Sequence, residues 1–311
     1  MTSLVCGLHN LKANAWGCVL TIGNFDGLHH GHLVVVQTLH RQARRLNLSS
    51  CVMLFEPHPQ EFFLAEKAPA RLMRLREKIK IFQSLAVDKV VCLRFNKHLA
   101  EMEAEIFVKK ILVDRLHVQM LIIGDDFRFG KERRGDFNLL EKLGKKYNFV
   151  VSSTPTVLFS DKRIGSSRVR DALKEGNFDL VSRLLTRPFT LSGRVMCGDQ
   201  RGRLLGFPTV NIALHRLVSP LKGVFIVRVY GLGQEPINGI ANCGKRPTVG
   251  GLKDLLEVHL FNFNKTIYGV RLEIEFLKKI RDEIKFTSLD ALKEQVLQDI
   301  DLTRNYFEQL P

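Results

Sequence analysis

Two histidines, His29 and His32, stand at a spacing that suits phosphate chemistry. They lie in residues 24–32, which join an apolar run at 18–23 to a helical pattern at 32–47. If the run is a strand, this segment sits at a strand's carboxyl end and at a helix N-terminus, where free N–H groups favour anions. Residues three apart can face the same ligand in the first helical turn. The spacing therefore predicts two imidazoles that donate to phosphate oxygens.

The string TIGNFDGLHHGH (residues 21–32) is far more specific than either histidine alone. An H-x-G-H segment at a strand-to-helix junction is typical of nucleotidyltransferases, in which two imidazoles stabilise charge on an α-phosphate. Gly31 and Gly27 allow a ligand to approach the backbone closely. The alternative is that the two histidines merely cap or pack the start of the helix.

Two later segments can join the same site. Residues 124–136 follow the apolar run 120–124 and mix acidic, aromatic and basic side chains at the end of a predicted strand, where α/β sheets bind ligands. Residues 165–173 carry Ser166, Ser167, Arg168 and Arg170 ahead of a helical pattern, which suits phosphate oxygens. The alternative is that one of the serines only caps that helix.

A glycine-punctuated segment, residues 193–212, predicts a second phosphate site. Its glycines Gly198, Gly202 and Gly206 permit a backbone that folds over phosphates. Thr209 and Asn211 alternate on one face of an extended strand and offer hard neutral oxygens, which suit a Mg²⁺ shared with ATP phosphates. No G-K-[ST] signature is present, and the alternative is an ordinary turn before a strand.

Glu257 is the candidate base for kinase chemistry. It alternates with Val258 and His259 along a strand-like run. An alcohol is a poor nucleophile near neutral pH, so its phosphorylation benefits from a carboxylate that accepts the proton. The alternative is a glutamate at a strand edge in solvent.

The elements that position these residues change in type along the chain. The first half predicts a parallel sheet with flanking helices, because strand-like runs at 18–23, 51–55, 89–95, 120–124 and 149–153 alternate with amphipathic stretches. After residue 187, short strand-like runs between glycine, proline and asparagine predict a small antiparallel barrel.

One long helix is predicted at the end of the barrel, over residues 288–308. Leu289, Leu292, Val296 and Ile300 share one face of it, and Thr287 or Ser288 is available as its N-cap. We place the domain boundary near residues 184–189, which gives domains 1–185 and 186–311.

Bulk properties limit the classes of protein. A chain of 311 residues with 45% hydrophobic and 25% charged residues suits two globular domains, and it shows neither a long apolar run nor a secretory signal. Six scattered cysteines without a zinc spacing predict reduced, mostly buried thiols. We therefore expect a cytoplasmic protein without a membrane partner. Nothing in the sequence bears on oligomeric state.

The formal net charge of +15 requires a nucleic-acid partner to be considered. The basic residues are scattered, and the densest stretch, 71–80, is interpreted as the solvated face of a helix. Nucleotide phosphates are also anions, so no nucleic-acid partner is expected. A basic RNA-binding protein stays as an alternative, although no K-M-S-K-S-like loop accompanies the H-x-G-H segment.

Together these segments resemble the bacterial bifunctional riboflavin kinase/FAD synthetase family over nearly the whole chain. Besides residues 21–32, the resemblance rests on FEPHPQEFF (55–63), GDDFRFG (124–130), GSSRVR (165–170), GRLLGFPTVNI (202–212), ANCGKRPTV (241–249), LEVHLFNF (256–263), YGVRLEIEF (268–276) and IRDEIKF (280–286). It implies an α/β nucleotidyltransferase domain that adenylylates FMN to FAD, followed by a flavokinase barrel of six or so strands that phosphorylates riboflavin. Each domain would use ATP and Mg²⁺, and the substrates would be small molecules.

The resemblance also assigns residues. For adenylylation it implies His29 and His32 as catalytic groups and Asp126 and Phe127 as flavin contacts; the ATP contacts would be Gly23, Phe25, Gly31, Ser166, Ser167 and Arg170. For the kinase it implies Glu257 as base and Thr209 and Asn211 as ligands of Mg²⁺ and nucleotide, with Gly198, Gly202 and Gly206 near the phosphates.

Three positions depart from the family's usual pattern. Gly165 stands where a serine is common, Val210 where alanine is common, and Val249 where phenylalanine is common. None removes a residue with an assigned chemical role. We expect both activities, with adenylylation the one to test first; an enzyme with one degenerate half is the alternative.

Overall fold

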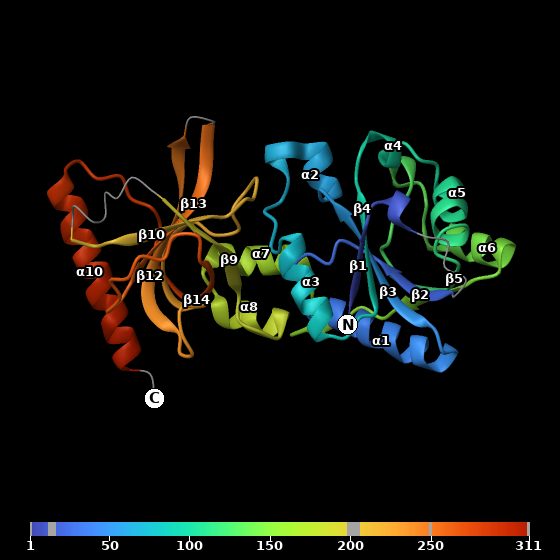
Figure 1. Ribbon diagram of the computed structural model, residues 1–311, viewed down its shortest axis with the longest axis horizontal. Coiled ribbons are helices and arrows are strands. Elements are labelled where there is room, and N and C mark those ends of the chain that lie inside the picture. The colour runs from blue at the N-terminus through green and yellow to red at the C-terminus, as the bar shows by residue number, and fades with distance from the viewer. Residues whose placement is uncertain (1, 12–16, 198–205, 249–250, 310–311) are drawn as a thin grey trace. The chain divides into compact units, whose positions relative to one another are not determined.

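The computed structural model describes residues 2–11, 17–197, 206–248 and 251–309. The chain forms two compact units. The first contains Met1–Pro69 and Met73–Ser166, and the second contains Ala70–Leu72 and Ser167–Pro311. Each unit has its own sheet and its own core (Figure 1).

A six-stranded parallel sheet forms the centre of the first unit, in the order β1-β4-β3-β2-β5-β6. Its strands are β1 Ser3–Cys6, β2 Cys18–Ile22, β3 Ser49–Glu56, β4 Lys89–Arg94, β5 Val118–Gly124 and β6 Val150–Thr154; a small hairpin, β7 Leu158–Phe159 and β8 Lys162–Arg163, follows. All five residues of β2 are buried, as expected for a strand covered on both faces.

Helices cover the two faces of this sheet (Figure 1). The first unit contains α1 His30–Leu46, α2 Pro59–Leu64, α3 Leu75–Ser84, α4 Lys97–Ala100, α5 Ala104–Phe107 and α6 Phe137–Tyr147, with a π-helical segment at Val108–Val113 and short 3-10 turns at Leu8–Asn10, Ala65–Lys67 and Lys131–Arg133. One core joins the sheet to α1 and α3, and a second joins it to α5 and α6. The expected α/β sheet with flanking helices is confirmed.

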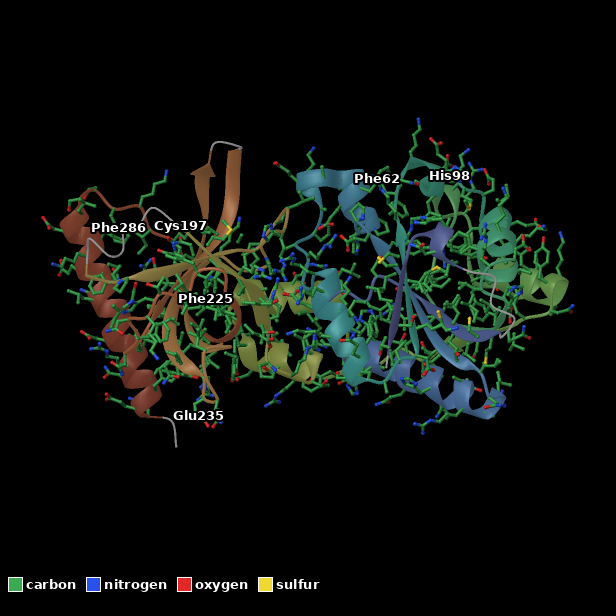
Figure 2. All side chains as sticks on the ribbon, viewed as in Figure 1. Phe62, His98, Cys197, Phe225, Glu235 and Phe286 are labelled. Atoms are coloured by element: carbon green, nitrogen blue, oxygen red, sulfur yellow. The ribbon has the colours of Figure 1, made fainter. Side chains whose placement is uncertain are left out.

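The second unit is built on a closed antiparallel barrel in the order β10-β13-β12-β11-β14-β9. Its elements are α7 Ser166–Glu175, α8 Phe178–Leu185, β9 Thr190–Met196, β10 Thr209–Ala213, β11 Gly223–Tyr230, β12 Ile237–Thr248, β13 Gly251–Leu260, β14 Arg271–Arg281 and α10 Leu289–Glu308. Phe225 lies fully buried within the barrel (Figure 2) and meets Phe276 edge-on, with the ring centroids 5.4 Å apart. The predicted small barrel is confirmed, with six strands.

Helix α8 packs with the barrel, because Phe178 stacks on Phe276 and meets Phe225 edge-on. Residues 167–185, which the sequence interpretation grouped with the first half, therefore belong to the second compact unit. The predicted boundary at residue 185 separates the segments that carry the two activities, not the two compact units, and it stays a prediction.

A buried ion pair attaches α10 to the barrel. Arg281 on β14 binds both carboxylate oxygens of Asp299, at 2.7–3.1 Å, and the Asp299 side chain is 4% exposed. Gln295 adds a donor to the same carboxylate. Ser288 is the N-cap of α10, as predicted, and Ile300 is buried. Leu289, the first residue of the helix, is 70% exposed.

The predicted cysteine state agrees with the structure. All six cysteines are free thiols, and Cys18, Cys51, Cys92 and Cys243 are buried. A hydrogen bond with Cys18, together with burial, raises the pKa of the Cys51 thiol, so this group stays protonated and unreactive.

We predict that Asp299→Ala lowers the free energy of unfolding of the barrel by about 3–5 kcal/mol, since it leaves the Arg281 guanidinium without its buried partner. Urea unfolding of the full chain measures this change. Glu101→Ala, which removes an exposed ion pair with Lys97, is the matched control and should cost about 0.5 kcal/mol or less. Equal losses in the two variants would show that the buried pair does not stabilise the docking of α10.

Candidate active sites

The strand order of the parallel sheet creates one switch point, between β2 and β5. From β2 the chain continues to β3 and β4 on one side, and then crosses to β5 on the other. In open α/β sheets the ligand crevice lies at the carboxyl ends of the strands flanking such a switch. The segments that follow β2 and β5 are 24–32 and 124–136, the two that the sequence singled out.

The loop after β2 has a constrained backbone. Phe25 and Leu28 have φ values of 46° and 42°, in the left-handed region that non-glycine residues rarely adopt. Gly27, at φ 82°, occupies the same region without strain. Such strain persists only where surrounding contacts enforce it. This loop is therefore held in its conformation by its neighbours.

The two histidines lie face to face at the start of α1. Their ring centroids are 3.7 Å apart with an interplanar angle of 18°. His29 is the N-cap of α1, and its Nδ1 atom accepts a hydrogen bond from the His32 backbone N–H at 3.4 Å. The other ring nitrogen, Nε2, therefore points away from this backbone N–H. The structure thus brings the pair together as predicted, and the capping role proposed as the alternative is also present.

Gly31, Gly23 and Phe25 shape the surroundings of the histidines. A Cβ on Gly31 would lie 3.3 Å from two atoms of the His29 ring, so glycine leaves room for that ring. Phe25 is 2% exposed, and its ring centroid lies 5.0 Å from that of His32. Its ring also covers Gly23. The buried Phe25 side chain therefore packs against the His32 ring. Any contact of Phe25 with ATP would have to come from its backbone, because the side chain is buried.

The segment before α7 is attached to the same loop. The Ser166 hydroxyl donates to the Asp26 carbonyl at 2.8 Å, and the Ile164 carbonyl lies beside Gly31. Ser166 therefore lies against the histidine loop, and its contact with ATP stays a prediction. Ser167 is exposed on α7, and Arg170 donates through Nε to the Ala70 carbonyl at 2.6 Å within the second unit. Their phosphate contacts stay predictions.

Asp126 and Phe127 follow β5, as predicted. Asp126 is exposed and pairs with Arg163 of the β7–β8 hairpin at 2.9 Å. Phe127 stacks on Phe129, with ring centroids 5.7 Å apart. This places an ion pair and a half-buried aromatic surface at the carboxyl edge of the sheet beside the histidine loop.

In the barrel, strand register places the kinase candidates on one face. Asn211 on β10 is directly opposite Glu257 on β13, and Glu257 is directly opposite Asn242 on β12. Residues opposite each other on antiparallel strands share a face, so these three side chains form a row across three strands. Thr209 lies in the next row, opposite His259. Glu257 is thus half-buried beside two amides, which argues against the alternative of a solvent-facing strand edge.

The side-chain oxygen of Asn211 fits a cation or a hydrogen-bond donor. Asn211 is 7% exposed, and its Oδ1 atom has no hydrogen-bond partner among the residues that the structure describes. Buried polar atoms are nearly always satisfied, so this oxygen is suited to a ligand that arrives with the substrate. Among the residues that the structure describes, no group of three or more His, Cys, Asp or Glu side chains could hold a metal. A Mg²⁺ bound here would depend on Thr209, Asn211, ATP phosphates and water, which suits its preference for oxygen ligands.

The rest of the glycine-rich segment is only partly described. Gly206 has φ 88°, and a Cβ there would meet no described residue within 4 Å. Gly198, Gly202 and Val249 lie outside the described residues. Val210 pairs with the fully buried Val258, so its extra bulk faces away from Thr209 and Asn211.

The sequence interpretation missed Lys78 and Asn242. The basic stretch 71–80 was interpreted as solvated, which is wrong for Lys78: it is 3% exposed, and its ammonium donates to the Asn24 carbonyl at 2.7 Å. A lysine in a helical pattern carries no sequence signal for burial. Asn242 is identified only by its register opposite Glu257.

Comparison with known proteins assigns both halves. The FAD synthetase family model matches residues 11–168, and the riboflavin kinase family model matches residues 185–307. The bifunctional riboflavin kinase/FMN adenylyltransferase of Escherichia coli (strain K12) is 49% identical over 305 residues, which are 98% of this chain and 97% of that protein. The chain belongs to this family.

Other relatives agree with that assignment. The bifunctional riboflavin kinase/FMN adenylyltransferase of Haemophilus influenzae is 47% identical over 98% of this chain and 99% of its own length. A crystal structure titled as a macrolide-efflux protein from Streptococcus pneumoniae superposes with a TM-score of 0.79 at 28% identity, covering 98% of this chain and 99% of that one.

In the described part of the chain, no helix is long and apolar enough to cross a membrane.

Membership of this family decides between the bifunctional enzyme and the two alternatives that the sequence left open. This member of the family is a bifunctional riboflavin kinase and FMN adenylyltransferase, with the FAD synthetase domain N-terminal to the flavokinase domain. The alternative of an enzyme with one degenerate half is set aside, since both halves match. The alternative of an RNA-binding protein is set aside for the same reason.

We predict that Gly165→Ser is tolerated and increases kcat/KM for FMN adenylylation. In the part of the chain that the structure describes, a Cβ at Gly165 would meet nothing within 4 Å, and a hydroxyl there can hydrogen-bond a phosphate oxygen. One such bond is worth about 0.5–1.5 kcal/mol, or about two- to tenfold in rate. Steady-state FAD formation from supplied FMN measures this.

The matched control is Gly130→Ser. There φ is 71° and a Cβ would lie 2.7 Å from the Ala104 backbone, so this variant should lose stability. A fall in adenylylation rate for Gly165→Ser, without loss of stability, would contradict the expected phosphate contact.

Proposed function

We propose that the two activities use the two sites described above, with riboflavin phosphorylated at the Asn211–Glu257 row and FMN adenylylated at the His29–His32 loop. The observation that supports this division most strongly is the register that sets Glu257 directly between Asn211 and Asn242. Such a row combines a proton acceptor with amides that can bind hydroxyl and phosphate groups.

In the kinase step, Glu257 accepts the proton of the ribityl 5′-hydroxyl as that oxygen attacks the γ-phosphorus of ATP. The bond from the γ-phosphorus to the bridging oxygen breaks, and FMN and ADP form. Asn211 and Thr209 hold the phosphates and the cation in place. When bound, Mg²⁺ neutralises charge that develops on the phosphate oxygens.

In the adenylylation step the FMN phosphate is already anionic and needs no base. It attacks the α-phosphorus of a second ATP, and pyrophosphate leaves. His29 and His32 donate hydrogen bonds to oxygens of the α-phosphate, where charge grows in the transition state. The loop contributes mainly by holding these donors in position. No covalent enzyme intermediate is required.

We also propose a cytoplasmic location. Six free thiols, four of them buried, are consistent with a compartment that keeps cysteines reduced.

Chromatography of flavins after incubation with riboflavin, ATP and Mg²⁺ tests the whole proposal. FMN should appear first and FAD after it. FMN alone would contradict the adenylylation proposal, and neither product would contradict both.

Replacing each catalytic group should remove one activity and leave the other. Glu257→Gln should lower kcat for FMN formation by about 10²–10⁴-fold, because the general base is lost, and leave FAD formation from supplied FMN unchanged. His29→Asn should do the reverse; asparagine keeps an N-cap acceptor for α1, so it removes the imidazole without removing the cap. Separate assays of the two steps measure this.

The matched control for Glu257→Gln is Glu235→Gln, an exposed glutamate between β11 and β12 (Figure 2), which should change neither activity. Loss of both activities in either catalytic variant would contradict separate sites.

Asn211→Ala should weaken the binding of the Mg²⁺ that the kinase step requires. We expect the Mg²⁺ concentration for half-maximal FMN formation to rise at least about tenfold, since the buried Oδ1 ligand is removed. Mg²⁺ titration of the kinase rate at fixed ATP measures this. The adenylylation step of the same protein is an internal control and should keep its Mg²⁺ dependence. An unchanged requirement in the kinase would exclude Asn211 as a ligand.

A further inference from the structure

Helix α3 contains a buried charge that the proposed mechanism does not use. The Lys78 side chain is 3% exposed, whereas Lys80, two residues later on the same helix, is exposed. Lysine is rarely fully buried, because removing an ammonium group from water costs free energy that only suitable partners offset. The position of Lys78 therefore needs a reason beyond helix packing.

The loop between β2 and α1, which contains His29 and the proposed adenylylation site, provides a hydrogen-bond partner for Lys78. The Lys78 Nζ atom donates to the Asn24 carbonyl at 2.7 Å. A hydrogen bond from a charged donor is shorter and stronger than one between neutral groups. Asn24 is the second residue after β2, and it immediately precedes Phe25, the first residue of the loop with a left-handed backbone.

The same segment of chain holds the next two loop residues. The Phe82 ring meets the Phe25 ring edge-on, with centroids 5.6 Å apart. The Met73 backbone N–H donates to the buried Asp26 carboxylate at 3.0 Å. Phe82 lies four residues after Lys78, so both point from one face of α3.

These contacts define a bracket, formed by Met73, Lys78 and Phe82, around three consecutive residues of the loop. The bracket acts on the part of the loop where the backbone is strained, and Phe25 in turn packs against His32. Within the bracket only Lys78 combines a charge with a hydrogen bond to the loop backbone.

We propose that Lys78 is a positioning residue for adenylyl transfer. By holding the Asn24 carbonyl it keeps the loop in the strained conformation that presents His29 and His32 to the α-phosphate. This inference rests on the proposed function of that loop. Because the role is to set geometry, its loss should reduce turnover far more than substrate affinity.

Lys78→Met tests the role, since methionine keeps an unbranched apolar chain and loses the donor. We expect kcat for FAD formation to fall by about a hundredfold, the effect of a small misplacement of catalytic groups, with KM values for ATP and FMN changed by less than about threefold. Lys80→Met is the matched control and should have wild-type kinetics. Riboflavin kinase activity of each variant should be unchanged.

Thermal unfolding separates positioning from stability. If Lys78 only stabilised the fold, Lys78→Met would lower the melting temperature and keep the wild-type kcat at temperatures where it is folded, which would overturn the proposal. Lys78→Gln keeps a donor for Asn24 without the charge, and its kcat should lie between those of Lys78→Met and the wild type. Equal kcat values for the Met and Gln variants would also overturn it.

His29→Asn distinguishes the two levels of inference. If His29→Asn abolishes FAD formation and Lys78→Met leaves kcat unchanged, the loop is the active site and the role of Lys78 is wrong. If His29→Asn retains full activity, the proposed site itself is wrong.

Discussion

The turn after β2 is the constraint on which the first half of the molecule depends. The chain leaves a fully buried strand and enters α1 within seven residues, and two of them, Phe25 and Leu28, adopt left-handed backbone conformations. This geometry directs two imidazole rings to the carboxyl edge of the sheet, in contact with each other. The sheet order sets the β5 segment beside it, and Ser166 is tied to its backbone. The parts of the site meet because this turn is fixed.

The barrel positions its candidate residues in a different way from the first unit. Its site needs no strained turn, because strand register alone sets Asn211, Glu257 and Asn242 in one row. The apolar partners Val210 and Val258 occupy the opposite face, so the alternation of a β-strand separates core from chemistry. The Asn211 side-chain oxygen, which has no hydrogen-bond partner in the described part of the chain, is where we expect a ligand to bind.

Much of this could be predicted from the sequence, for physical reasons. Strands β2 to β6 and helix α10 have strong apolar patterns, and the loop residues at 24–32 are defined by local spacing. The features that the sequence did not predict depend mostly on contacts between residues far apart in the chain. Strand β1 is short and mostly exposed, so its run gave no signal. Helix α8 joined the barrel through Phe178, and Lys78 became buried through a carbonyl 54 positions away. No pattern of local residues encodes those contacts.

The fate of the phosphates of ATP tests most directly whether one chain carries out two different transfers. With riboflavin as the only flavin supplied, label from the γ-phosphate of ATP should appear in FMN and then in FAD. Among the flavins, label from the α-phosphate should appear in FAD alone, and once all FMN has been converted, one ADP and one pyrophosphate should have been released for each FAD. Label from the α-phosphate in FMN, or FAD without pyrophosphate, would contradict a kinase acting at the γ-phosphorus followed by an adenylyl transfer at the α-phosphorus.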